Sequence, residues 1–202
     1  GYSLEFNYEL AQGGFLKSIS SYRSTKLDFV SDLDYAAADF FKIHYVDEYK
    51  QTTQEFQYTS LSDGKFAYIL GAYYYQQEGT TDRSAIPGSQ VVDVSNQTFL
   101  KGLLGQLGVD TLVGHPLSFL YPSGDINHNG TVDTLSYALY SNFTYDFSEK
   151  WQLGVGLRWG RETKEADWAI DGSVSGYFGL ATDELKKKQS DSNFLPSISI
   201  NY

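Results

Sequence analysis

The 202-residue sequence contains no cysteine and no methionine, and it has few cationic side chains, with 15 Lys and Arg against 25 Asp and Glu. Without cysteine there can be no disulfide framework, thiolate zinc site or thiol catalysis. The formal net charge of −10 gives no electrostatic attraction to phosphate backbones, so we expect no nucleic-acid partner. Because a complete bacterial gene product starts with methionine, we expect a mature protein or a piece of a longer one.

Long apolar runs are also missing. A membrane helix needs about 18 consecutive apolar residues, and the longest run, residues 67–75, is interrupted by Gly71 and rich in tyrosine. This excludes a helical membrane protein. It does not exclude a β-barrel, whose strands need only alternate apolar and polar residues. Aromatic residues make up 16% of the chain, which argues against a disordered acidic tail.

Period-two alternation, typical of β-strands, dominates the sequence. We predict seven strands, at about 1–10, 15–30, 49–60, 66–78, 135–147, 151–159 and 194–202. Tight turns at residues 11–14, 62–65 and 148–150 alternate with long connections at 31–48, 79–133 and 168–192. In an up-and-down sheet this order places all short turns at one end and all long loops at the other, as in outer-membrane barrels.

Aromatic residues flank the aliphatic centres of the strands. Trp151 and Trp159 enclose Leu153, Val155 and Leu157 on one face of their strand, which matches a lipid-facing band between interfacial aromatic girdles. The sequence therefore predicts an all-β fold, an antiparallel up-and-down transmembrane β-barrel with about seven strands in this chain, with short turns on one side and long loops on the other. A soluble β-sandwich alternates equally well but has no reason to sort its loops by length.

The long connection at 79–133 is the main candidate for ligand binding, because loops longer than about 12–15 residues are usually functional or disordered. It carries apolar residues that offer contact area to a ligand or to a cover over the barrel mouth: Leu100, Leu103, Leu104, Leu107, Phe119 and Tyr121. The four leucines have helical spacing, although the intervening glycines weaken a helix. A packed apolar loop patch is the alternative interpretation.

A weak candidate for a metal site lies at residues 125–133. Asp125, Asn127, Asn129 and Asp133, with Gly130 between them, match the first nine positions of a calcium loop. The bidentate acid expected at position 12 is replaced by Ser136, so a polar turn leading into the next strand is the alternative. No local motif supports catalysis, since the GSVSG segment at 172–176 has valine where a nucleophile elbow needs serine. We therefore expect that the protein is not an enzyme and binds no cofactor.

Several strand segments resemble the barrel of TonB-dependent outer-membrane receptors of the siderophore-receptor type. They are LKSISSYR at 16–23, QEFQY at 54–58, GAYYY at 71–75, SYALY at 136–140, GVGLRW at 154–159 and FLPS at 194–197. The resemblance implies that residues 1–202 are part of one barrel domain of about 22 strands, with the family's plug domain absent from this chain. It carries over no individual binding residue.

The resemblance further implies a receptor in the outer membrane of a Gram-negative bacterium, which takes up a scarce ligand such as a ferric siderophore by TonB-driven transport. The implied partners are outer-membrane lipid, the protein's own plug domain, the TonB complex and a small-molecule ligand. Two other functions stay open at this stage. One is a small complete outer-membrane barrel, and the other is a soluble secreted β-sandwich that binds calcium or carbohydrate.

Overall fold

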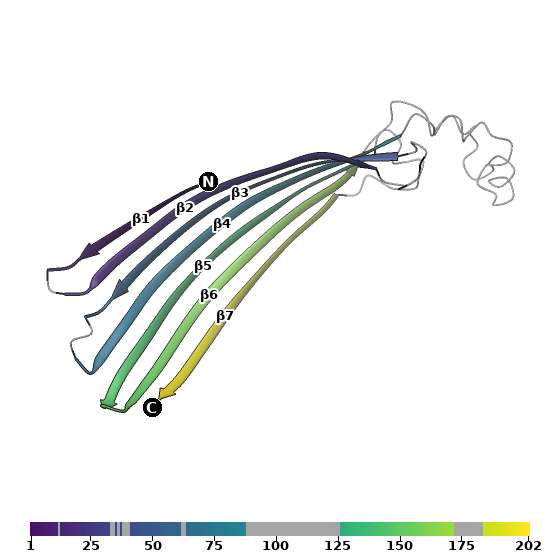
Figure 1. Ribbon diagram of the computed structural model, residues 1–202. Coiled ribbons are helices and arrows are strands. Elements are labelled where there is room, and N and C mark those ends of the chain that lie inside the picture. The colour runs from purple at the N-terminus through teal and green to yellow at the C-terminus, as the bar shows by residue number, and fades with distance from the viewer. Residues whose placement is uncertain are drawn as a thin grey trace, which may run out of the picture.

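A computed structural model describes residues 1–11, 13–32, 35, 37, 41–61, 64–87, 126–171 and 184–202. Seven strands form a single antiparallel sheet in the order β1-β2-β3-β4-β5-β6-β7 (Figure 1). Their bounds are β1 Tyr2–Glu9, β2 Phe15–Asp32, β3 Phe41–Thr59, β4 Phe66–Pro87, β5 Ile126–Ser148, β6 Trp151–Asp171 and β7 Glu184–Asn201. Among these residues there is no helix with the length and hydropathy needed to cross a membrane.

Every strand pairs with its neighbours in the sequence, so the predicted up-and-down topology is confirmed. The tight turns that join β1 to β2, β3 to β4 and β5 to β6 lie at one end of the sheet, and the opposite strand ends gather at the other (Figure 1). Within the described residues β1 and β7 each pair on one side only, so the sheet is open.

Local chemistry fixes two of the turns. Gly13 and Gly14 have φ angles of 89° and 95°, which side chains disfavour, and Leu10 N donates to Gly14 O at 3.0 Å. In the β5–β6 turn the hydroxyl of Ser148 accepts hydrogen bonds from the backbone N–H groups of Lys150 and Trp151 at 3.3 and 3.1 Å.

The strands at the far end are longer than the alternation predicted. β3 begins at Phe41, β4 continues to Pro87, β5 begins at Ile126 and β7 begins at Glu184. The connections predicted at 31–48, 79–133 and 168–192 are correspondingly shorter. The prediction was wrong because the outer face is largely polar and charged in these extensions, so they lack the apolar outer-face alternation by which the other strand segments were recognised.

The register gives the sheet one apolar and one polar face. Leu139, Val155 and Leu157 lie on the apolar face, whereas Asn142 and Arg158 lie on the polar face.

The burial of these two faces is the reverse of that in a soluble domain. Leu139 is 58% exposed, and the polar face holds the buried Asp47, Thr81 and Thr134, together with Ala138, the only apolar residue of the described chain counted as core. The sheet is therefore built inside out, and we call its polar face the inner wall and its apolar face the outer face.

Candidate functional site

The inner wall is the candidate functional surface, and its central contact joins three strands. The Tyr140 hydroxyl on β5 donates to Glu55 Oε1 on β3 at 2.5 Å. To reach it the ring lies across β4 over Gly71, where a Cβ would overlap the ring atoms. Arg158 on β6 is the register partner of Tyr140 and brings a cation to the same part of the wall. A glycine under an aromatic ring thus allows a polar crosspiece to stiffen the sheet.

The inner wall also carries ion pairs between lysine and glutamate side chains. Lys17 Nζ lies 3.0 Å from Glu5 Oε1, and Lys164 Nζ lies 2.9 Å from Glu162 Oε1. The hydrogen bond from Lys164 to the Glu162 carboxylate raises the pKa of the lysine amine. These pairs are solvent-exposed and each contributes little to stability. They give the inner wall paired charges of both signs.

A second cluster crosses the inner wall near the end that carries the long connections. It is a row of one side chain from each of five consecutive strands, which we call the mouth row: Phe29, Tyr45, Arg83, His128 and Trp168. Phe29 stacks on Tyr45 at 4.7 Å, the guanidinium of Arg83 lies 5.3 Å from the Tyr45 ring centre, and His128 lies 5.0 Å from Trp168. Arg83 and His128 are register partners, so the row is continuous.

Arg83 is held in place from one side. Its Nη2 lies 3.8 Å from Oδ2 of Asp47, a carboxylate that is only 8% exposed and also accepts a hydrogen bond from Thr81. The Arg83 Nε has no hydrogen-bond partner among the described residues. A guanidinium that is aligned by a buried carboxylate and flanked by aromatic rings can bind an anionic, planar group.

The structure tests the predicted site residues only in part. Leu100, Leu103, Leu104, Leu107, Phe119 and Tyr121 lie outside the described residues, as does Asp125. Asn127, Asn129 and Asp133 lie on β5, and Asn127 Oδ1 accepts a hydrogen bond from Ser84 at 2.8 Å. The described residues contain no group of three or more His, Cys, Asp or Glu side chains that could hold a metal ion. The calcium site stays a prediction.

Sequence reasoning missed the mouth row. Arg83, His128 and Trp168 were assigned to long connections, although they belong to β4, β5 and β6. A signal was present in the small residues Gly79 and Gly130, because each lies beneath an aromatic ring on the inner wall, that of Tyr49 and that of Trp168 respectively. Isolated glycines in polar alternating segments mark such contacts.

No family model matches the sequence, and no curated protein matches it significantly. Solved structures do match. The chain is similar to the ferric yersiniabactin uptake receptor FyuA of Yersinia pestis, with a TM-score of 0.64 and 13% identity over 98% of this chain and 24% of that one. It is also similar to the siderophore receptor PiuA of Acinetobacter baumannii, with a TM-score of 0.55 and 13% identity over 98% of this chain and 29% of that one. The chain thus spans just under a quarter of the first receptor and less than a third of the second, and it has the fold of a segment of a receptor β-barrel.

Proposed function

We propose that residues 1–202 form part of the wall of an outer-membrane barrel receptor that imports a scarce small molecule, with a ferric siderophore as the ligand class. The chain carries out no catalysis. The observation that supports this function best is the inside-out sheet, in which an exposed apolar face is bounded by aromatic residues and a buried face is polar. Such a sheet is stable where lipid covers one side and a water-filled lumen lies on the other.

The alternatives fit the structure less well. A small complete barrel requires β1 to pair with β7, and in the described residues both are edges. A soluble β-sandwich requires two packed sheets, but all seven strands belong to one. Further strands of a longer protein would pair with both edges, because unpaired backbone groups are not tolerated in lipid.

We assign ligand capture to the end of the sheet that carries the mouth row and the long connections. Arg83 and the neighbouring aromatic rings offer an anionic planar chelate both a charge partner and stacking surfaces. The connection at 88–125, with its apolar residues Leu100, Leu103, Leu104, Leu107, Phe119 and Tyr121, would add contact area above the row. A plug domain in the longer protein, coupled to TonB, would supply the gate and the energy.

Uptake of a radiolabelled ferric siderophore by cells that express the full-length protein tests the proposal. We expect the protein in the outer-membrane fraction, and uptake that disappears when TonB is deleted. A protein recovered in the soluble fraction would exclude the receptor assignment. Membrane localisation with uptake that is independent of TonB would leave a passive barrel instead.

Two changes within the full-length protein test where capture occurs. Replacing residues 88–125 with a short Gly/Ser linker should lower ligand affinity but preserve membrane insertion, because β4 and β5 stay paired. Arg83→Gln should weaken binding of an anionic chelate by about tenfold, since charge-assisted contacts contribute about 1.5–3 kcal/mol. Lys26→Gln is the matched control, because Lys26 pairs with Glu48 on the outer face. If Arg83→Gln and Lys26→Gln bind the chelate with equal affinity, the mouth row is not part of the binding site.

A further inference from the structure

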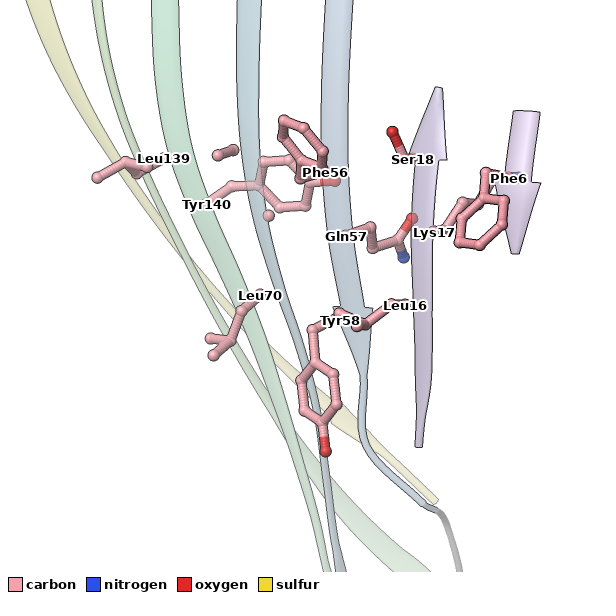
Figure 2. Close-up of a pocket in the computed structure, with 12 residues that line it drawn as sticks. Phe6, Leu16, Lys17, Ser18, Phe56, Gln57, Tyr58, Leu70, Leu139 and Tyr140 are labelled. Atoms are coloured by element: carbon pink, nitrogen blue, oxygen red, sulfur yellow. The ribbon is translucent and has the colours of Figure 1, made fainter. Parts of the chain in front are cut away.

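The outer face carries an apolar hollow of about 600 Å³ that the receptor function does not explain. Figure 2 shows the residues that line it, which come from β1 to β5. Its walls are formed by Phe6, Leu16, Phe56, Leu70 and Leu139, and its floor includes Ser18 and Ala72. Almost the whole lining is apolar, which sets the hollow apart from the polar depressions at the far end of the strands.

Alternation of side-chain size across the strands produces the hollow. In register order the outer face presents Phe6, Ser18, Phe56, Ala72 and Leu139, one residue from each of β1 to β5. The small residues on β2 and β4 leave two troughs, with Phe56 as the ridge between them. The ridge residues are well exposed: Phe6 by 60%, Phe56 by 57% and Leu139 by 58%. No neighbouring part of the described chain fills the troughs.

Ser18 and the nearby polar side chains of the outer face bond to one another. The Gln54 amide nitrogen donates to Ser18 Oγ at 3.0 Å and to the Glu55 carbonyl at 3.2 Å, and its oxygen accepts from the Ser20 hydroxyl. An amide in hydrocarbon is costly unless it is hydrogen-bonded in this way. The surface therefore does not need hydrogen bonds from an occupant, which favours a hydrocarbon chain over a peptide or a sugar.

We propose that this hollow, which we call the acyl groove, holds an acyl chain of a membrane lipid more tightly than the rest of the outer face does. The inference rests on the proposed function, because it requires the outer face to lie in lipid. The occupant is a lipid because the groove is continuous with the exposed apolar face.

Native mass spectrometry of the full-length receptor, released from nanodiscs of palmitoyl-oleoyl phosphatidylethanolamine, tests the acyl groove by counting retained lipids. Ala72→Phe and, separately, Ser18→Leu fill the two troughs. Val155→Phe is the matched control, because it adds bulk to the outer face at a residue outside the groove. We expect the lipid-bound fraction to fall about fourfold for each methylene displaced in the filled variants and to be unchanged in Val155→Phe.

Equal retention by the wild type, both filled variants and the control would overturn the proposal. A change from dimer to monomer in Ala72→Phe, without loss of lipid, would show that a second copy occupies the groove and would also overturn it. Heat-modifiable migration on gels verifies that each variant is folded, and Ser18→Leu gives an independent reading if Ala72→Phe does not fold. Failure of the receptor function would be seen earlier, as a protein that does not enter the outer membrane.

Discussion

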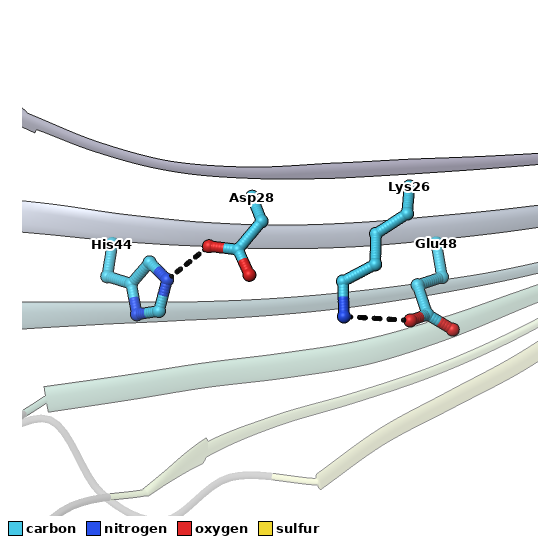
Figure 3. A network of polar contacts seen from close by, with 4 residues as sticks. All are labelled: Lys26, Asp28, His44 and Glu48. Atoms are coloured by element: carbon cyan, nitrogen blue, oxygen red, sulfur yellow. Dashed lines mark hydrogen bonds and ion pairs between the residues drawn. The ribbon is translucent and has the colours of Figure 1, made fainter.

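The near and far halves of the same strands differ most clearly in the side chains of their outer face. In the near half, next to the tight turns, the outer face carries residues such as Leu139, Val155 and Leu157 between aromatic residues. In the far half the same face carries ion pairs. Lys26 Nζ lies 3.3 Å from Glu48 Oε1, and His44 Nε2 lies 2.8 Å from Asp28 Oδ1 (Figure 3).

The β6–β7 pair repeats this pattern. Lys186 Nζ lies 3.1 Å from Asp167 Oδ2, and Lys188 pairs with Glu165. Charged pairs of this kind are stable in water or among lipid headgroups, but are costly in hydrocarbon. Backbone pairing continues through both halves, so the strand does not end where the environment changes. Under the proposed function, the comparison teaches that the length of the apolar segment reflects the thickness of the membrane rather than the length of the strand.

The largest expected difference between the two halves is their response to an arginine on the outer face. Val155→Arg should cost about 2–4 kcal/mol of barrel stability, because the guanidinium would lie near the middle of the apolar band. Thr163→Arg, on the same face of β6 in the far half, should cost almost nothing. Urea unfolding of the full-length protein in lipid vesicles measures both. Equal losses would mean that the apolar band does not end at Trp159.

The crosspiece on the inner wall should respond to substitution of its glycine. Gly71→Val places side-chain atoms where the Tyr140 ring lies, and overpacking of this kind costs about 1–3 kcal/mol. The double variant Gly71→Val with Tyr140→Ala should recover part of that loss, because the clash is relieved. If the double variant is no more stable than Gly71→Val alone, the glycine is required for another reason.

Removal of the hydrogen bond alone should have a smaller effect. Tyr140→Phe keeps the ring over Gly71 but deletes the donor to Glu55. We expect a loss of about 0.5–1.5 kcal/mol. The matched control is Tyr74→Phe, whose hydroxyl bonds to Gln76 on the same strand at 2.8 Å. Unfolding midpoints of the two variants should differ if the bond across three strands matters more than the local one.

The pair shown in Figure 3 should give the smallest effect, and it should depend on pH. The hydrogen bond from His44 lowers the pKa of the Asp28 carboxyl. The contribution of the pair to stability is therefore fully present above the usual aspartate value of about 3.9 and is lost as the pH falls through the lowered pKa of the folded state.

Asp28→Asn should accordingly destabilise the far half slightly at pH 7, and the difference from the wild type should vanish at strongly acidic pH. Amide hydrogen exchange of β2 and β3 can detect so local a change. A difference that persists at low pH would show that the aspartate acts through something other than its charge. Lys26→Gln, which alters the neighbouring pair, is the comparison variant.

Calcium binding is expected to be absent in the far half, although Asp125, Asn127, Asn129 and Asp133 resemble a calcium loop. Alternate residues of an extended strand are about 7 Å apart, whereas the ligands of one calcium ion each lie about 2.3–2.6 Å from it. Asn127, Asn129 and Asp133 belong to β5, and this spacing argues against a common ion. Calorimetric titration should therefore give no heat. A signal that is lost in Asp125→Ala would restore the calcium site.

The contrast between the near and far halves also explains which parts of the fold and of the candidate site could be predicted from the sequence. The seven strands, their antiparallel order and the two faces were predicted, because each strand carries apolar alternation in the near half. The mouth row was not, since Arg83, His128 and Trp168 lie where the outer face is polar and no apolar alternation marks a strand. Glu55 and Tyr140 are 85 residues apart in the sequence, and no local pattern joins them. Their contact needs the strand register, which in turn is fixed by the turns.

The sorting of connections by length has a consequence for the order of assembly. The β5–β6 pair is closed by a turn at Glu149 and Lys150, whereas β4 and β5 are separated by residues 88–125. Closing the longer connection costs about 2–3 kcal/mol more in chain entropy. Hairpins β1–β2, β3–β4 and β5–β6 should therefore form first, as three preassembled units. The pairings β2–β3, β4–β5 and β6–β7 would follow, so membrane insertion would proceed by adding hairpins rather than single strands.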